Sequence, residues 1–200
     1  FGKSTISVAL AEQLSSQGAK VGLVDADIYG PSIPLMMGTN QKPEVQNNKI
    51  IPLESRNIKV MSIGFMTGSS GAIAWRGPMT TKAIYQLLSV VEWGALDYLI
   101  IDTPPGTGDI HLSLLENYHI DGVIMVTTPQ KVAASDVIKG IDLYQKFSVP
   151  ILGIVENMSD IFPGSNGELI AAEFDIPLIA KLPFNPEIAS ESDKGTAIGH

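Results

Sequence analysis

Short apolar runs and longer amphipathic segments alternate along the chain. Between residues 5 and 17 apolar side chains recur at helical spacing, and Gly18 follows as a residue that commonly ends helices. Residues 21–24 then form a short apolar run that leads into Asp25, and residues 98–101 form another that leads into Asp102. Both runs predict buried strands of a parallel sheet with acidic residues at their carboxyl ends.

The rest of the chain repeats this alternation. Further strands are predicted at residues 60–63, 123–126, 151–155 and 178–180. Further helices are predicted at residues 80–91, 133–147 and 168–174. This order predicts an α/β fold with a doubly wound, mostly parallel sheet and helices on both faces. Residues 31–53 are rich in Pro, Asn, Gln and Gly, which predicts a long surface excursion with a small hairpin.

Composition narrows the class of protein. The 200 residues are 44% hydrophobic and 17% charged, which predicts a single domain spanning residues 1–200. A formal net charge of −8 disfavours nucleic acid as a partner. No apolar run of about 18 residues and no leader pattern is visible, so we expect a cytoplasmic protein without a membrane partner. The chain contains no cysteine, and we expect its natural N-terminal strand to be missing because the first helix begins almost at Phe1.

The first residues carry the clearest chemical pattern. Gly2, Lys3, Ser4 and Thr5 match the last third of the phosphate-binding pattern G-x-x-x-x-G-K-[ST] and lead directly into the first predicted helix. In such a loop, backbone N–H groups approach phosphate oxygens at the positive end of the helix. Lys3 would bridge the β- and γ-phosphates of ATP, and the Ser4 hydroxyl would bind Mg²⁺. The alternative is a chance Gly-Lys-Ser at a helix start.

Asp102 is a candidate magnesium-binding carboxylate. It closes an apolar strand, where the Walker B aspartate of nucleotide hydrolases holds Mg²⁺ through water. The alternative is that this aspartate only caps the segment that follows the strand. Pro104, Pro105, Gly106 and Gly108 favour the first interpretation, because they form a turn-rich loop suited to sensing a γ-phosphate.

Asp25 and Asp27 follow the preceding strand and should reach the same edge of the sheet. A carboxylate there can orient the attacking water or hold the water shell of the metal. We favour Asp27 for the water and therefore predict Lys3 and Asp27 as the catalytic residues. The alternative is that one of the two aspartates only stabilises its loop.

Two other groups of residues are less informative. His111, His119 and His200 lack the spacing of metal ligands, so solvated or structural roles are expected. Trp75 and Arg76 precede a helix start, where they could be structural or could face a partner, and composition does not decide between the two.

Several segments together resemble the Mrp-type iron–sulfur cluster carrier ATPases, within the wider MinD/ParA group of P-loop proteins. The resemblance extends over most of the chain, and the segments that carry it are Gly2-Lys3-Ser4-Thr5, Val24-Asp25-Ala26-Asp27-Ile28-Tyr29-Gly30-Pro31-Ser32, Trp75-Arg76-Gly77-Pro78-Met79, Ile101-Asp102-Thr103-Pro104-Pro105-Gly106-Thr107-Gly108-Asp109 and Val155-Glu156-Asn157-Met158-Ser159.

This resemblance implies an ATP-binding and ATP-hydrolysing carrier protein that serves iron–sulfur cluster assembly or transfer. It implies ATP and Mg²⁺ as cofactors, a homodimer, and iron–sulfur apoproteins or an assembly scaffold as partners. It also implies that Asn157 contacts the adenine, and that Pro183 and Phe184 border the base.

The chain departs from the family pattern in two places. A further signature lysine of the family would precede Phe1 and lies outside the sequence. The cluster-binding Cys-x-x-Cys is absent, and Ser159 runs straight into Asp160 where the family has a cysteine-containing segment. Either the loop has been deleted or residues are omitted at this junction, and we expect omitted residues. An iron–sulfur cluster is possible only in that case.

Two other functions fit the same fold. One is a MinD/ParA-like positioning switch that binds a membrane or DNA in one nucleotide state, although residues 189–200 do not form the basic amphipathic helix that a membrane version would need. The other is a nucleotide-regulated scaffold without a cluster.

Overall fold

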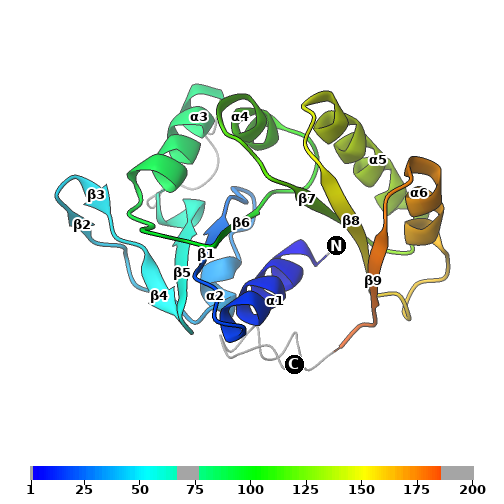
Figure 1. Cartoon of the computed structure of the whole chain (residues 1–200), viewed down its shortest axis with the longest axis horizontal. Helices are drawn as coiled ribbons and strands as arrows, with labels where there is room; N and C mark the ends of the chain where they lie inside the picture. The colour runs from blue at the N-terminus through cyan, green and yellow to red at the C-terminus, as the bar shows by residue number, and fades with distance from the viewer. Residues whose placement is uncertain (1, 67–76, 186–200) are drawn as a thin grey trace. The chain divides into compact units, whose positions relative to one another are not determined.

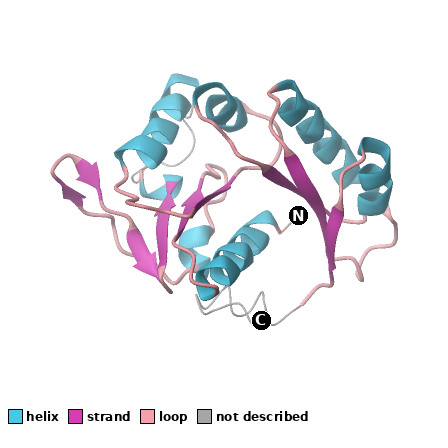
Figure 2. Ribbon diagram, in the orientation of Figure 1, coloured by secondary structure: helices cyan, strands magenta, loops and turns pink. Residues whose placement is uncertain are grey.

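The computed structural model describes residues 2–66 and 77–185, which form two compact units. One unit contains Lys3–Pro104, and the other contains Gly2 together with Pro105–Asn185. Figure 1 traces both units along the chain, and Figure 2 shows that each combines strands with helices. The organisation of residues 1–200 as a single domain stays a prediction.

The first unit is built on a four-stranded sheet with the order β4-β5-β1-β6. Strands β5, β1 and β6 are parallel, and β4 runs antiparallel to β5. The strand bounds are Val21–Asp25 for β1, Leu53–Ser55 for β4, Ile58–Ser62 for β5 and Tyr98–Asp102 for β6. The sequence predicted β1, β5 and β6, but the short strand β4 was missed.

Helices cover both faces of this sheet. Successive side chains of a strand point to opposite faces, and all five residues of β1 are buried, so neither face is open to solvent at this strand. Helix α1 (Lys3–Ser16) packs Val8 and Ala11 against Leu23 and its neighbours, together with the short helix α2 (Ile33–Met36). Helix α3 (Gly77–Tyr85), continued by a π-helical turn at Gln86–Val90, lies across the strands from α1 (Figure 1).

The irregular segment 31–53 agrees only in part with its prediction. The small hairpin is confirmed: β2 (Val45–Gln46) pairs antiparallel with β3 (Lys49–Ile50). Asn47 and Asn48 form its turn with φ of 51° and 61°, the left-handed values that a two-residue hairpin needs. The prediction of a surface excursion was wrong for Ile33 and Met37, which are fully buried against α1 and β1.

The second unit contains a parallel sheet with the order β7-β8-β9. Its elements are α4 (Asp109–Asn117), β7 (Val123–Thr127), α5 (Lys131–Lys146), β8 (Ile151–Asn157), α6 (Asn166–Phe174) and β9 (Leu178–Leu182). Apolar side chains of α5 and α6 pack on β8 to form its core, which includes Val137, Ile141, Ile154 and Ile170. The predicted α/β class is therefore confirmed.

Helix α4 was not predicted from the sequence. Its buried side chains include His111 and Ser113 as well as Ile110 and Leu114, so apolar periodicity alone does not reveal it. Within the described residues, no helix is long and apolar enough to cross a membrane.

Candidate functional site

Polar side chains gather at the carboxyl end of the sheet in the first unit. Asp25, at the end of β1, is the register partner of Ser62 on β5 and of Asp102 on β6. All three side chains are buried. Buried polar groups need partners, because desolvating them without compensation is costly. The contacts of these three residues therefore define the site.

Asp102 is held by the first two turns of α1. The Ser4 hydroxyl donates to Oδ2 of Asp102 at 2.7 Å, and the Ser7 hydroxyl donates to Oδ1 at 2.9 Å. Burial raises the pKa of the Asp102 carboxyl, and the charge of Asp27 also raises it, whereas the two serine bonds and Lys3 oppose the increase. The structure thus joins Ser4 and Asp102, the two residues that the sequence assigned separately to Mg²⁺.

The other residues of the glycine-lysine-serine segment lie at the start of α1. The Lys3 ammonium donates to the carbonyl oxygen of Pro104, just beyond β6, at 3.5 Å. Thr5 lies in the first turn of the helix. Gly2 has φ of 78°, and a Cβ atom there would overlap the side-chain amide of Asn157. The backbone conformation therefore favours glycine at this position, and a larger residue would also require the Asn157 amide to move.

Asp25 serves as a buried anchor for the segment after β1. Its Oδ1 accepts the Asp27 backbone N–H at 3.1 Å, and its Oδ2 accepts the Ile33 N–H at 3.1 Å. The Ser62 hydroxyl donates to Oδ2 at 3.4 Å. Burial raises the pKa of Asp25 to about 7, although the two backbone hydrogen bonds oppose this increase and the charges of Asp102 and Asp27 add to it.

Asp27 lies at the same edge but is only half-buried. Its Oδ1 accepts the backbone N–H groups of Tyr29 at 3.0 Å and Gly30 at 3.3 Å, which closes a turn typical of aspartate. Both aspartates therefore stabilise the segment after β1. A role for Asp27 in orienting water stays a prediction.

The residues expected near a base lie in the second unit. Asn157 ends β8 and is the register partner of Leu182 on β9. Pro183 and Phe184 follow β9 directly and are exposed, and the Phe184 N–H donates to Oδ1 of Asp160 at 2.7 Å.

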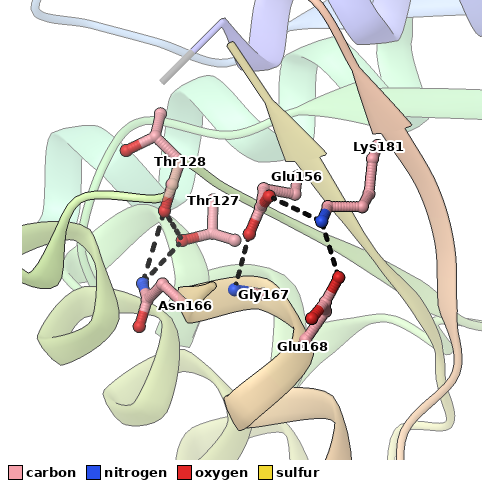
Figure 3. A network of polar contacts seen from close by, with 7 residues as sticks. All are labelled: Thr127, Thr128, Glu156, Asn166, Gly167, Glu168 and Lys181. Atoms are coloured by element: carbon pink, nitrogen blue, oxygen red, sulfur yellow. Dashed lines mark hydrogen bonds and ion pairs between the residues drawn. The ribbon is translucent and has the colours of Figure 1, made fainter. Parts of the chain in front are cut away.

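Beside Asn157, sequence analysis missed a polar cluster centred on Glu156 (Figure 3). Glu156 is fully buried at the end of β8 and accepts the Gly167 N–H at the start of α6. Sequence analysis also missed Ser7, although its spacing of three residues from Ser4 places both on one helix face. An acidic residue inside an otherwise apolar strand was the available signal for Glu156.

The junction at Ser159 and Asp160 forms a turn, with Ile161 N–H donating to the Met158 carbonyl at 3.3 Å. Ser159 N–H also donates to the Leu182 carbonyl at 3.0 Å. The omission of residues at this junction stays a prediction.

Among the described residues, no group of three His, Asp or Glu side chains is arranged to hold a metal ion. His111 is buried in α4, and His119 is exposed with Nε2 at 3.1 Å from the Asp121 carboxylate. Trp75, Arg76 and His200 lie outside the described residues.

Two curated relatives of this chain carry the same name. A protein of Rickettsia bellii called iron-sulfur cluster carrier protein is 58% identical over 193 residues, covering 96% of this chain and 61% of the relative. The Escherichia coli K12 protein of the same name is 43% identical over 208 residues, covering 98% of this chain and 56% of the relative. The chain thus spans about three-fifths of the length of the relatives it matches.

Solved structures show the same fold. A nucleotide-binding protein of Archaeoglobus fulgidus in complex with ADP has a TM-score of 0.83 and 35% identity, and the match covers 97% of this chain and 81% of that chain. The septum site-determining protein MinD of Pyrococcus horikoshii, complexed with Mg-ADP, has a TM-score of 0.76 at 21% identity, covering 98% of this chain and 82% of that chain.

The model of the ParA family described as NUBPL iron-transfer P-loop NTPase matches residues 1–200. The glycine-lysine-serine start of α1, the strand-end aspartate bonded to its serine, and the matched relatives agree with this assignment. The chain therefore belongs to the family of NUBPL iron-transfer P-loop NTPases.

Proposed function

We propose that this protein binds MgATP, hydrolyses it, and uses this cycle in the assembly or transfer of iron–sulfur clusters. The observation that carries the nucleotide part is the 2.7 Å bond from the Ser4 hydroxyl to Asp102. Asp102 accepts the single proton of that hydroxyl, so the lone pairs of Ser4 Oγ stay available to a cation. The pair therefore fits the protein side of a nucleotide-bound Mg²⁺.

The magnesium site needs few protein ligands. Mg²⁺ keeps several waters and takes phosphate oxygens when it binds a nucleotide, so one hydroxyl and one nearby carboxylate are sufficient. In this proposal Ser4 binds the ion directly and Asp102 acts through water. An ion held by these residues would supply positive charge against the charge that develops on the phosphates. Asp102, with its pKa raised by burial, gains a nearby positive charge that favours its ionised form.

Lys3 and Asp27 are the proposed catalytic residues. The Lys3 ammonium donates to the Pro104 carbonyl at 3.5 Å, and a phosphate oxygen would be a stronger, charged acceptor. Asp27 is proposed to orient the attacking water, which requires one of its oxygens to remain free of the turn. Only Oδ1 is bonded to Tyr29 and Gly30, and Oδ2 accepts neither N–H group.

Other residues are assigned to the adenine base, and this assignment rests on the family resemblance. We propose that Gly2, Lys3, Ser4 and Thr5 surround the phosphates, while Asn157, Pro183 and Phe184 contact the adenine.

The carrier role rests on the family and on the names of the relatives. We propose iron–sulfur apoproteins or an assembly scaffold as partners, a homodimer as the assembly, and the cytoplasm as the location. The cluster is cargo, and thiolate ligands for it are not among these 200 residues, which contain no cysteine. In this proposal such ligands come from outside these 200 residues.

The nucleotide proposal is tested by calorimetry on the full-length protein. Lys3→Ala should severely weaken MgATP binding or turnover, because it removes the side-chain cation assigned to the transferring phosphate. Lys139→Ala, at an exposed lysine on α5, is the matched control and should behave as the parent protein. Equal ATP affinity and equal turnover in the parent protein and Lys3→Ala would refute the proposal.

A further inference from the structure

Glu156 is a buried acid with an unusual set of contacts. It lies at the end of β8, fully shielded from solvent, and its Oε2 accepts the Gly167 N–H at 2.7 Å. Its Oε1 accepts no hydrogen bond from the described residues and lies 3.8 Å from Nζ of Lys181 on β9. One carboxylate thus contacts the start of α6 and the neighbouring strand (Figure 3).

The start of α6 is shaped to receive this carboxylate. Ser165, at the N-cap position, makes no side-chain cap, so the Gly167 N–H is bonded by Glu156 instead. A Cβ atom at residue 167 would stand 2.7 Å from Oε2 of Glu156, which only glycine avoids. The positive end of the helix favours a negative charge at this place.

The two segments that are proposed to contact the adenine lie next to residues of the Glu156 cluster in the sequence. Asn157 is the next residue after Glu156, and its side chain points to the opposite face of the strand. Lys181 is the register partner of Glu156 on β9, and the chain reaches Pro183 and Phe184 two residues later. Glu156 therefore joins the two strand ends that present these residues.

We propose that Glu156 is a positioning residue for base recognition: by binding α6 and Lys181 together, it fixes where Asn157, Pro183 and Phe184 meet the base. This inference rests on the proposed function, and it adds a specificity-determining residue that does not itself touch the nucleotide. Because the phosphates are assigned to residues 2–5, Glu156 contributes to binding of the base and not to binding of the triphosphate.

Glu156→Gln is the most direct variant. It preserves the shape of the side chain, but one amide oxygen replaces two carboxylate oxygens. If that oxygen accepts from Gly167, the amide NH₂ faces the Lys181 ammonium, and two donors then oppose each other. The strand ends lose their common anchor while the fold retains the same packing volume.

The experiment compares two ligands on the full-length protein, MgATP and magnesium tripolyphosphate, which lacks the base. For Glu156→Gln we expect ATP affinity to fall roughly tenfold, tripolyphosphate affinity to stay unchanged, and the preference for ATP over GTP to shrink. Lys181 is exposed, and Lys181→Gln should lower both the ratio of ATP to tripolyphosphate affinity and the preference for ATP over GTP. The effect should be smaller than that of Glu156→Gln.

The matched control is Asn166→Ala. Asn166 holds the same helix start, donating from Nδ2 to the carbonyl oxygen of Thr128 at 3.3 Å (Figure 3). It also donates to the carbonyl oxygen of Gln130 at 3.2 Å. This variant should lower the unfolding temperature, yet leave the ratio of ATP to tripolyphosphate affinity unchanged. It separates general loosening of α6 from positioning of the base.

Two outcomes overturn the inference. One is an unchanged ratio of ATP to tripolyphosphate affinity in both Glu156→Gln and Lys181→Gln. The other is an equal change of that ratio in Asn166→Ala, which would assign the effect to helix stability. If the parent protein binds neither ATP nor tripolyphosphate, the proposed nucleotide function itself fails. That result can be distinguished from the two outcomes that overturn only the role of Glu156.

Discussion

Replacing Asp25 by asparagine should change how the stability of the protein depends on pH. Asp25 is fully buried, and burial raises its pKa to about 7 from the ordinary value of 3.8. Between these two values the unfolded chain releases the proton while the folded protein retains it. The folded state then binds more protons, so its stability falls as pH rises through this range and levels off above about pH 7.

The size of the effect follows from the pKa difference. Each pKa unit corresponds to about 1.4 kcal/mol, so between pH 5 and pH 8 the ionisation of Asp25 costs about 3 kcal/mol of stability. Asparagine removes this dependence because it does not titrate. It also loses one acceptor for the Ile33 N–H or the Asp27 N–H, a constant cost of about 1 to 3 kcal/mol at every pH.

The assay is urea unfolding of the metal-free, full-length protein at several pH values from 5 to 8. The free energy of unfolding of Asp25→Asn minus that of the parent protein should therefore increase by about 3 kcal/mol from pH 5 to pH 8. Asp136→Asn, at an exposed aspartate of α5, is the control and should show no such trend. A difference that stays constant from pH 5 to pH 8 would refute the assignment of a raised pKa to Asp25.

Three further predictions concern the proposed nucleotide site. Ser7→Ala removes one of the two hydroxyl donors to Asp102 and should reduce magnesium-dependent turnover roughly fivefold, a loss of about 1 kcal/mol, in a Mg²⁺ titration of phosphate release. Asp27→Asn should lower kcat more than it raises the Kd for ATP, and a main effect on Kd would place Asp27 in the metal shell instead. Gly2→Ala forces a Cβ atom into the amide of Asn157 at φ of 78°, so calorimetry should detect a severe loss of ATP binding, and unchanged affinity would contradict this geometry.

The strand-end acids were predictable because they depend only on local pattern. Asp25 and Asp102 each follow an apolar run, and parallel strands place their carboxyl ends at one edge, as the register pairing of these two residues confirms. The hairpin at 45–50 followed from turn chemistry in the same way, since asparagine tolerates left-handed backbone conformations.

Residues whose role depends on long-range contacts were not predictable. Ser7 is separated from Asp102 by 95 positions, and its spacing from Ser4 places it on the same helix face without identifying Asp102 as its partner. Ile33 lies in a polar segment, yet tertiary packing buries it. The sequence indicated Glu156 only as a member of the motif that contains Asn157, because its partner Gly167 lies 11 positions away on the next helix.

The most direct test is the dependence of ATP affinity on magnesium in the parent protein and in Asp102→Asn. The full-length parent protein should bind ATP at least about tenfold more tightly with Mg²⁺ than with EDTA. In Asp102→Asn, where Ser4 no longer donates to a carboxylate, most of this advantage should disappear. An equal magnesium advantage in both proteins, or no binding of ATP by the parent protein, would contradict the account.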